Sequence, residues 1–281
     1  MQLFMALALL AATAPGAVVL KPVANMYRDP TVDSEVVSQA IYGSNIGVIE
    51  TRPGWLHVRT PDDYTGWMPA EDLRRLGAGE KGYAASGRMA WVESLFAHLY
   101  NEPDVTKRRP LITVPFETRL EAIAEPQDNP RWIEVRLVDD RAGWVQRGDI
   151  SFDSQPLSIE AAIELSRRFL GLPYTWGGTS SFGYDCSGFV QMLCRRRGTV
   201  IPRDADLQAA WQGVVPVKRE ELQAGDLLFF GSSAEHITHT GMYIGDGKFV
   251  NATTWTHPVV QICDLGDPHW TRLLVASRRL K

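Results

Sequence analysis

The sequence predicts an α+β protein in which two small β-barrels precede a domain that packs helices on an antiparallel sheet. Three observations predict it: a repeated block in the first half, short alternating apolar segments between turn residues there, and clear helical periodicity only after residue 156. The chain has 281 residues, and at about 100 to 200 residues per domain this length favours two or three domains. The expected units are a candidate signal segment 1–16, barrels 17–78 and 79–152, and a C-terminal domain 153–281.

Residues 3–20 (LFMALALLAATAPGAVVL) have the apolar character of a secretion signal, with small-residue cleavage sites at 12–14 or 15–17. No Lys or Arg precedes this run and Pro15 fits the site poorly, so an ordinary apolar N-terminus is the alternative. Pro15 and Gly16 leave about 12 uninterrupted apolar residues where a bilayer requires about 20, so no transmembrane helix is expected. We expect export to the periplasm or cell envelope, with a cytoplasmic location as the alternative.

Two blocks of the first half recur in the second barrel. Residues 55–67 match 132–144 at a spacing of 77, with Trp, Val, Arg, Gly and Trp in common, and 24–27 match 97–100 at a spacing of 73. The second copy therefore carries four extra residues between these blocks. Within each copy, apolar residues alternate in short runs separated by Asp, Gly and Pro, which is typical of a small barrel. We read most of its tryptophans as core residues.

The C-terminal domain is expected to begin after the turn-rich connector 153–156. The pattern from Ile159 to Leu170 places apolar residues on one helical face, with Ser158 able to cap its start and Gly171 able to end it. A third domain therefore starts with this helix.

Cys186 stands directly before a second helical pattern, so it falls in the first turn of that helix. Unpaired N–H groups and the helix dipole at this end stabilise a thiolate, which is the nucleophilic form of cysteine, and the amides can also serve an oxyanion. The alternative for a lone cysteine is a small buried apolar residue, and we assign that role to Cys194 and Cys263. Three cysteines without C-x-x-C spacing form neither a disulfide framework nor a metal pair.

His239 is the candidate base for this thiol. It lies in the expected strand 238–244, which a Gly-Asp-Gly turn joins to the expected strand 248–252, and an apolar strand at 227–230 precedes both. A nucleophile on a helix and a base on a strand is the papain-like arrangement.

Two resemblances follow from these motifs. The pattern Tyr-x-x-Pro with later Gly-Trp pairs resembles bacterial SH3-like domains over about residues 17–152. Residues 156–281 carry PYTWGG, DCSGF, PR, GDLLFF and HTGMYIG in that order, and so resemble the NlpC-type papain-like peptidases of the bacterial cell wall. The resemblance implies a cysteine endopeptidase that hydrolyses the γ-D-glutamyl-diamino acid bond of peptidoglycan stem peptides. Two SH3-like domains in front are similar to the subgroup that requires a free N-terminal L-Ala, used in wall remodelling or muropeptide recycling.

The resemblance assigns Cys186 as nucleophile and His239 as base. The third residue, usually a histidine in this family, falls on Asn251, whose side-chain oxygen can still accept the imidazole N–H. His257 is the rival, although Pro258 follows it and it lies beyond the strand. A regular two-residue hairpin would put His239 and Asn251 on opposite faces, so we predict a β-bulge near Thr240–Gly241 or a three-residue loop.

The resemblance also implies a set of substrate-binding residues: Tyr174, Trp176, Asp185, Ser187, Arg203, Asp204, Glu35 and Tyr64. Tyr174 would reach the oxyanion or the scissile bond, and Trp176 would form a wall. Asp185 and Ser187 would bind the L-Ala ammonium and backbone. Arg203, in the same motif as Asp204, would pair with the D-Glu α-carboxylate.

Ala205 replaces the serine that often follows this motif, so one hydrogen bond to the substrate is expected to be missing. Glu35 and Tyr64 of the first barrel would close the site around the amine, and Arg141 replaces Tyr64 in the second copy. A solvated glutamate and a barrel tyrosine are the alternative for this pair.

Charge and composition exclude several partners. With 29 Lys plus Arg against 33 Asp plus Glu, the formal net charge is −4, so nucleic acid is not expected as a partner. The histidines lack the spacing of a metal site, and no metal or cofactor is expected. An amidase or acyltransferase on the same fold and a non-catalytic peptidoglycan-binding protein remain as alternatives. The sequence leaves open meso-diaminopimelate or L-Lys as the third residue, and the oligomeric state.

Overall fold

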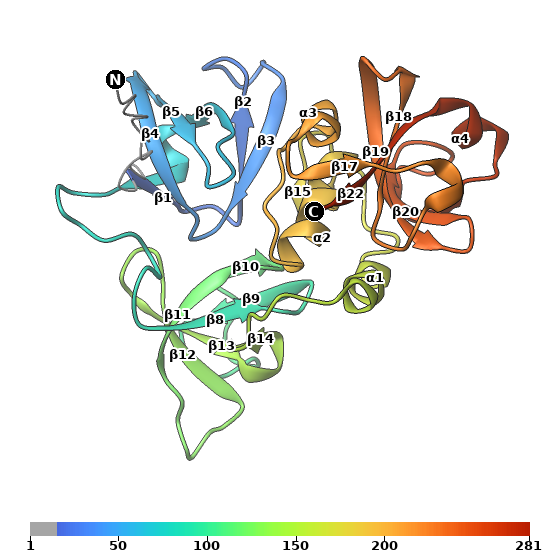
Figure 1. The fold of residues 1–281 in the computed structure, drawn as a ribbon. Helices are drawn as coiled ribbons and strands as arrows, with labels where there is room; N and C mark the ends of the chain where they lie inside the picture. The colour runs from blue at the N-terminus through green and yellow to red at the C-terminus, as the bar shows by residue number, and fades with distance from the viewer. Residues whose placement is uncertain (1–15) are drawn as a thin grey trace, which may run out of the picture.

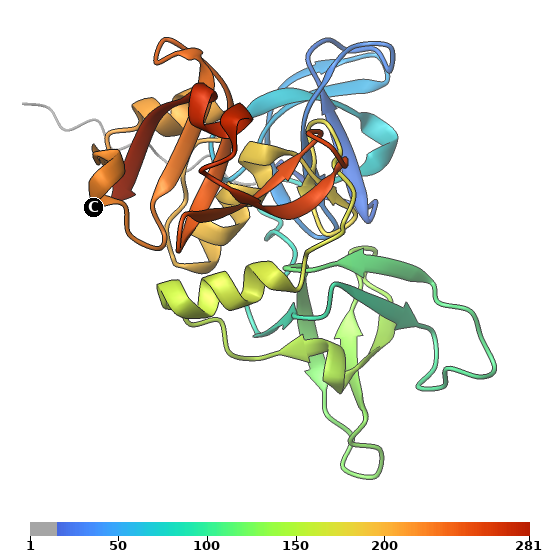
Figure 2. The same cartoon turned by 90° about the vertical axis from the view of Figure 1, so that its right-hand side faces the viewer.

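The structure is a computed structural model that describes residues 16–281. Three lobes meet around one central helix, α2 (Cys186–Arg196). In Figure 1 the first barrel is at the upper left, the second barrel is at the bottom and the C-terminal domain is at the upper right. Figure 2 shows helix α1 (Ile159–Arg167) between the second barrel and the rest of the C-terminal domain.

The first barrel is an antiparallel sheet in the order β3-β2-β6-β5-β4-β1-β7. Its alternating strands bury one face each, for example Leu56 and Val58 in β5, which are at most 1% exposed. The strands are β1 (Ala17–Val19), β2 (Val23–Tyr27), β3 (Val36–Ile41), β4 (Asn45–Arg52), β5 (Trp55–Arg59), β6 (Thr65–Pro69) and β7 (Leu73–Arg75), with a 3₁₀ turn at Ala70–Asp72.

The second barrel has the order β10-β9-β13-β12-β11-β8-β14, which repeats the first order strand for strand. The same aromatic contact recurs as well: Tyr27 meets Trp55 edge-on in the first barrel, and Tyr100 meets Trp132 in the second. The predicted sequence repeat therefore corresponds to two domains with the same fold. The strands are β8 (Arg88–Val92), β9 (Phe96–Tyr100), β10 (Ile112–Pro115), β11 (Arg119–Ala124), β12 (Trp132–Arg136), β13 (Ala142–Gln146) and β14 (Ile150–Ser151), with a 3₁₀ turn at Arg147–Asp149.

The C-terminal domain packs helices on a six-stranded antiparallel sheet of order β17-β22-β18-β19-β20-β21, so the predicted α+β class is confirmed. Its strands are β17 (Val214–Pro216), β18 (Leu227–Ser233), β19 (His236–Gly245), β20 (Lys248–Thr253), β21 (Val259–Asp264) and β22 (Leu274–Leu280). A small hairpin pairs β15 (Thr179–Ser180) with β16 (Gly183–Tyr184). The remaining helices are α3 (Ala205–Ala210), α4 (Pro268–Leu273) and a 3₁₀ turn at Arg219–Glu221.

Helix α2 is buried through nearly its whole length, because residues 186–194 all lie under 9% exposure. It packs on β19 and β20, so its first turn faces the strands that carry the candidate base. The first helix, α1, begins at Ile159 with Ser158 accepting from the backbone of Ala161, as predicted. It ends at Arg167, earlier than the pattern suggested, and Leu170 lies exposed in the turn that follows.

The β19–β20 hairpin contains a β-bulge at Ile244. Met242 pairs with Val250 and Tyr243 with Phe249, but Gly245 pairs with Lys248, so Ile244 has no partner. This shift by one residue brings His239 and Asn251 to the same face. A bulge was predicted, but its position near Thr240–Gly241 was wrong. The left-handed backbone at Gly245 (φ 99°) starts the turn and displaces the irregularity to this end of the strand.

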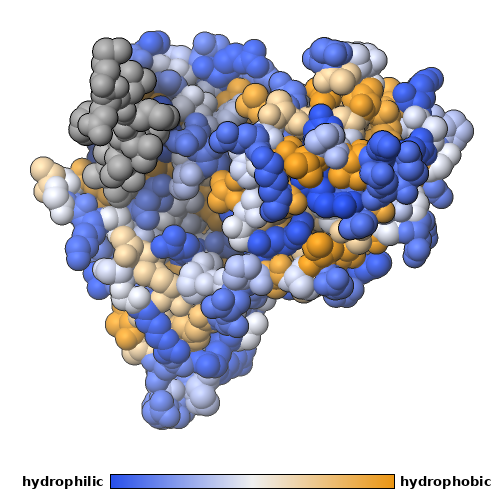
Figure 3. Space-filling view, in the orientation of Figure 1, coloured by the Kyte–Doolittle hydropathy of each residue, from blue (hydrophilic) through white to orange (hydrophobic). Residues whose placement is uncertain are grey.

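The surface is mixed. In the space-filling view, apolar patches lie over the C-terminal domain, whereas the lower end formed by the second barrel is mainly hydrophilic (Figure 3). Within residues 16–281, no helix has the length and apolar character that crossing a membrane requires. Most of the signal-like run lies outside the described residues, but its last part, Ala17–Val19, is strand β1 and is fully buried in the first barrel.

Candidate active site

Cys186 is the first residue of α2, with Asp185 as the N-cap. The Asp185 side chain accepts a hydrogen bond from the backbone N–H of Gly188 at 2.7 Å, which fixes the start of the helix. A Cβ on Gly188 would lie 2.2 Å from the carbonyl oxygen of Gly178. The glycines in the two motifs therefore let the helix start pack directly against the 175–178 turn.

The Cys186 thiol is buried between α2 and β19, where it meets the backbone N–H groups of Thr240 and Ser187. Burial, followed by the nearby Asp185 carboxylate, raises the pKa of Cys186 to about 12. The helix N-terminus was expected to stabilise a thiolate, but in this site desolvation outweighs it. The resting nucleophile is therefore a thiol that needs a base.

His239 lies on β19 next to Thr240, and its Nε2 is 2.9 Å from Oδ1 of Asn251 on β20. The Asn251 amide nitrogen donates to the carbonyl oxygen of Gln261 at 3.3 Å, so the amide oxygen is the atom that faces the imidazole. An oxygen at that position requires the proton on Nε2 and leaves Nδ1 unprotonated. Burial lowers the pKa of His239 to about 4, so the ring is neutral and ready to accept a proton.

Trp270 on α4 holds the other side of this ring. Its indole stacks on the His239 imidazole with ring centres 5.1 Å apart and planes 28° apart, and Phe230 packs against both rings. Sequence reasoning missed Trp270, because an aromatic residue 31 positions away in an unrelated helix gives no motif. The ring is thus fixed by one hydrogen bond and by aromatic packing.

His257, the rival third residue, is exposed, and the hydrogen bonds of its backbone go to Trp255, Val259 and Gln261. The geometry therefore favours Asn251 as the residue that orients His239.

Tyr174 lies beside Cys186. Burial raises the pKa of the Tyr174 phenol, and the nearby Cys186 raises it further, because a thiolate there disfavours a second negative charge. The phenol is therefore a neutral hydrogen-bond donor beside the nucleophile. Trp176 is 62% exposed at the edge of the site.

Arg203 and Asp185 form a buried two-pronged ion pair. Nη1 and Nη2 of Arg203 donate to the two carboxylate oxygens at 3.1 and 2.6 Å, and Nη1 also donates to the Ser187 hydroxyl at 2.7 Å. The Arg203 side chain is only 1% exposed. This differs from the expected pairing of Arg203 with a substrate carboxylate, because its donors already bind protein groups in this structure.

The first barrel contacts the C-terminal domain at the edge of this site. Glu35 Oε1 accepts from the Trp176 indole N–H at 3.2 Å, and the Tyr64 hydroxyl donates to Asp204 at 3.1 Å. Burial, and then the Asp204 charge, raise the pKa of Tyr64, so its phenol stays protonated. The structure thus brings Glu35 into contact with Trp176 and Tyr64 into contact with Asp204, both of which were predicted to bind substrate. Arg28 forms a salt bridge with Glu35 at 2.5 Å.

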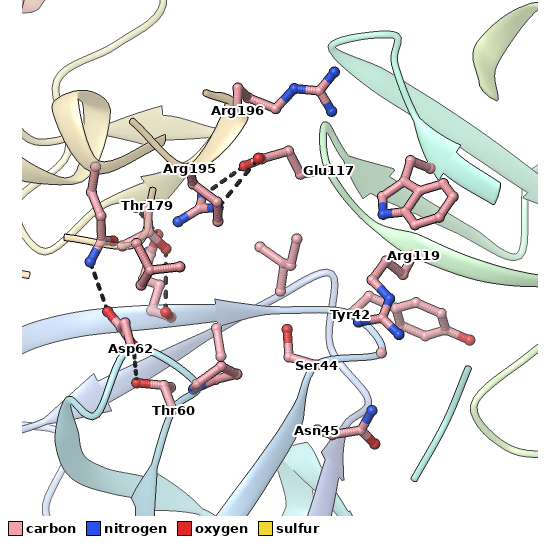
Figure 4. Close-up of a pocket in the computed structure, with 18 of the residues that line it drawn as sticks. Tyr42, Ser44, Asn45, Thr60, Asp62, Glu117, Arg119, Thr179, Arg195 and Arg196 are labelled. Carbon is pink, nitrogen blue, oxygen red and sulfur yellow. Dashed lines mark hydrogen bonds and ion pairs between the residues drawn. The ribbon is translucent and has the colours of Figure 1, made fainter. Parts of the chain in front are cut away.

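A cavity of about 420 Å³ lies where the three lobes meet (Figure 4). On one side Gln191 of α2 donates to Asp62 of the first barrel at 2.8 Å, and on another Arg195 of α2 donates to Glu117 of the second barrel at 2.6 Å. Both barrels therefore hold the helix that carries the nucleophile. No cluster of metal-ligating side chains occurs among residues 16–281.

Comparison with known proteins gives matches to both parts of the chain. Residues 171–279 match the model described as the NlpC/P60 family, and residues 26–73 match the bacterial dipeptidyl-peptidase SH3 domain. The chain is 30% identical over 263 residues to a gamma-D-glutamyl-L-lysine dipeptidyl-peptidase of Bacillus cereus, covering 88% of this chain and 75% of that protein. It is 30% identical over 259 residues to the protein of the same name from Bacillus subtilis, covering 88% and 82%.

A solved structure shares the whole arrangement. The crystal structure of an NlpC/P60 family protein from Bacillus cereus superposes with a TM-score of 0.80 at 26% identity, covering 94% of this chain and 99% of that one. The likeness therefore extends over both barrels as well as the C-terminal domain.

Proposed function

The chain belongs to the NlpC/P60 family of cysteine peptidases, and on this premise we propose that it hydrolyses the γ-D-glutamyl-diamino acid bond of stem peptides with a free N-terminal L-Ala. As a family member it is a hydrolase and a peptidoglycan endopeptidase. The observation that carries the finer proposal is the position of Glu35 and Tyr64, which the first barrel supplies at the edge of the site against Trp176 and Asp204.

The proposed mechanism begins with a neutral pair. Nδ1 of His239 removes the proton from the Cys186 thiol as sulfur attacks the γ-carbonyl carbon of D-glutamate, and Asn251 keeps the resulting imidazolium oriented. The ring then gives this proton to the amine of the leaving diamino acid, and water hydrolyses the thioester. The candidate donors to the oxyanion are the backbone N–H groups of Cys186 and Ser187, at the start of α2, and the Tyr174 hydroxyl.

Charge supports recognition of a free amine. Three carboxylates belong to the motifs around the nucleophile or contact them: Asp185, Asp204 and Glu35. Two arginines, Arg203 and Arg28, offset only part of this negative charge. An ammonium ion beside Asp185 and Glu35 is favoured electrostatically, whereas an N-acetyl group would lose that attraction. The names of the two Bacillus relatives, which specify a dipeptidyl-peptidase and a γ-D-glutamyl bond, agree with this reading.

The substrate implies an envelope role. We propose that the enzyme acts outside the cytoplasm on released or wall-bound stem peptides, in remodelling or recycling. Curated relatives that match the C-terminal part include a murein DD-endopeptidase of Escherichia coli, 37% identical over 126 residues.

The test is amine selectivity. Free L-Ala-γ-D-Glu-diamino acid tripeptides and their N-acetylated forms, with meso-diaminopimelate or L-Lys, are incubated with the wild type and with Glu35→Gln and Tyr64→Phe variants. We expect the wild type to favour the free amine by about 100-fold, and Glu35→Gln to lower this preference by about fivefold, because Glu35 is solvent-exposed and an exposed charge pair is worth at most about 1 kcal/mol.

Glu50→Gln is the matched control, because Glu50 lies in the same barrel and, among residues 16–281, forms a salt bridge only with Arg52. Equal cleavage of free and N-acetylated peptides would remove the amine-recognition role. Cleavage of neither would remove the bond assignment itself.

A further inference from the structure

Arg203 is a deeply buried cation with three donor groups to satisfy. Its two terminal nitrogens hold Asp185 and Ser187, the residues on either side of the nucleophile. The remaining donor, Nε, binds the hydroxyl oxygen of Ser38 at 3.1 Å. Ser38 belongs to the first barrel, so a residue from another domain completes the coordination of this guanidinium.

Ser38 is itself fixed by the barrel. It lies in β3, where its backbone pairs with Met26 of β2, and it is only 3% exposed. The next residue, Gln39, accepts from the backbone N–H of Thr179 at 3.2 Å and from the Thr179 hydroxyl at 3.3 Å. Strand β3 therefore holds the C-terminal domain at two adjacent positions.

Ser38 also borders the junction cavity, whereas Arg203 does not. Figure 4 shows Thr179 of the C-terminal domain directly beside a strand of the first barrel, where it bonds to Gln39. Without the Ser38 hydroxyl, Nε of Arg203 would have no hydrogen-bond partner among the described residues. The guanidinium could then tilt, and the carboxylate that it holds would tilt with it.

We propose that Ser38 is a positioning residue: through Arg203 it sets the orientation of the Asp185 carboxylate, so that docking of the first barrel forms part of the amine-binding site. This inference rests on the proposed function and extends it. Ser38 touches neither Cys186 nor His239, so its contribution falls on substrate binding and not on the chemical step. The first barrel thus acts on recognition in two ways, directly with Glu35 and indirectly with Ser38.

The test is Ser38→Ala, measured with the free-amine tripeptide. We expect KM to rise about tenfold while kcat changes less than twofold, since one hydrogen bond to a charged group is removed. Ser44→Ala is the matched control, because Ser44 lines the same cavity wall but its hydroxyl makes no hydrogen bond within the described residues. It should keep the wild-type KM and kcat.

A double-mutant cycle with Arg203→Lys separates positioning from a general loss of structure. Lysine has no Nε–H for Ser38, so Ser38→Ala should have no further effect on KM in that background. Equal effects of Ser38→Ala in both backgrounds, or an unchanged KM in the single variant, would overturn the inference. If the wild type leaves the tripeptide intact, the proposed function fails instead, and the two failures are therefore distinguishable.

Discussion

Replacement of Asn251 by alanine tests the unusual third residue of the site. Asn251 is fully buried, and its amide oxygen is the only hydrogen-bond partner of His239 Nε2 among the described residues. Alanine would leave that N–H without an acceptor in an aromatic environment formed by Phe230 and Trp270. The ring could then rotate or change tautomer, and Nδ1 would no longer be held as the proposed proton acceptor.

The expected magnitude follows from the geometry. A buried donor left without a partner costs about 1 to 3 kcal/mol. Since about 1.4 kcal/mol corresponds to a factor of ten in rate, a cost of about 2 kcal/mol lowers kcat about 30-fold. KM should change little, because the Asn251 side chain bonds to His239, Gln261 and Cys263 and not to the residues proposed to bind the amine.

The assay is steady-state cleavage of the tripeptide by chromatography of the released amino acid. Thr253→Ala is the control: it removes another buried polar side chain from the same strand, one whose hydroxyl accepts a hydrogen bond from the backbone N–H of Trp255. Its kcat should stay near the wild-type value. A kcat for Asn251→Ala within threefold of the wild type, in a protein that melts normally, would refute the role of Asn251 in orienting the ring.

Four further predictions follow from the same site. Gly241→Ala should lower both the melting temperature and kcat, because a Cβ there would lie 2.7 Å from the Phe249 ring; circular dichroism and the cleavage assay would detect it, and wild-type values would contradict the packing. Alkylation of Cys186 should be slow at neutral pH and rise at alkaline pH, since its pKa is raised to about 12; a fast, flat profile above pH 5 would indicate a thiolate–imidazolium pair. The acid limb of kcat/KM should lie near pH 4, because catalysis needs neutral His239 and is lost as the pH falls through its lowered pKa; a limb near pH 6.5 would count against burial of the ring. Trp270→Leu should lower kcat with little change in KM, and an unchanged kcat would show that the stacking is not needed.

Local patterns predicted much of this molecule. The repeat in the first half became two barrels with the same strand order, because matching alternation and turn residues specify matching strands. Cys186 at a helix start and His239 on a strand were readable from short motifs. The spacing between His239 and Asn251 was also enough to predict an irregular hairpin.

The position of that irregularity was not readable. The bulge lies at Ile244 because Gly245 and Asp246 both adopt positive φ, which the Gly-Asp-Gly sequence permits but does not place. The raised pKa of the thiol was also not readable, because the sequence shows the helix start but not the depth of burial around it. Both depend on packing by distant strands.

Contacts between domains were the least predictable part. The Nε–H group of Arg203 bonds to Ser38, which is 165 positions away in another domain and belongs to no recognisable motif. The stacking of Trp270 on His239 is similar, since it requires the C-terminal helix to return to the sheet. Sequence periodicity describes the face of an element, whereas docking between domains requires their three-dimensional arrangement.

The central claim is that Cys186 cleaves the γ-D-glutamyl-diamino acid bond, and mass spectrometry of the products tests it most directly. Free L-Ala-γ-D-Glu-meso-diaminopimelate and its L-Lys counterpart are incubated with the wild type and with Cys186→Ala. We predict that the wild type releases the dipeptide L-Ala-γ-D-Glu and the free diamino acid from at least one of the two, and that Cys186→Ala releases neither. Intact tripeptides with the wild type, cleavage at the L-Ala–D-Glu bond, or undiminished cleavage by Cys186→Ala would contradict it.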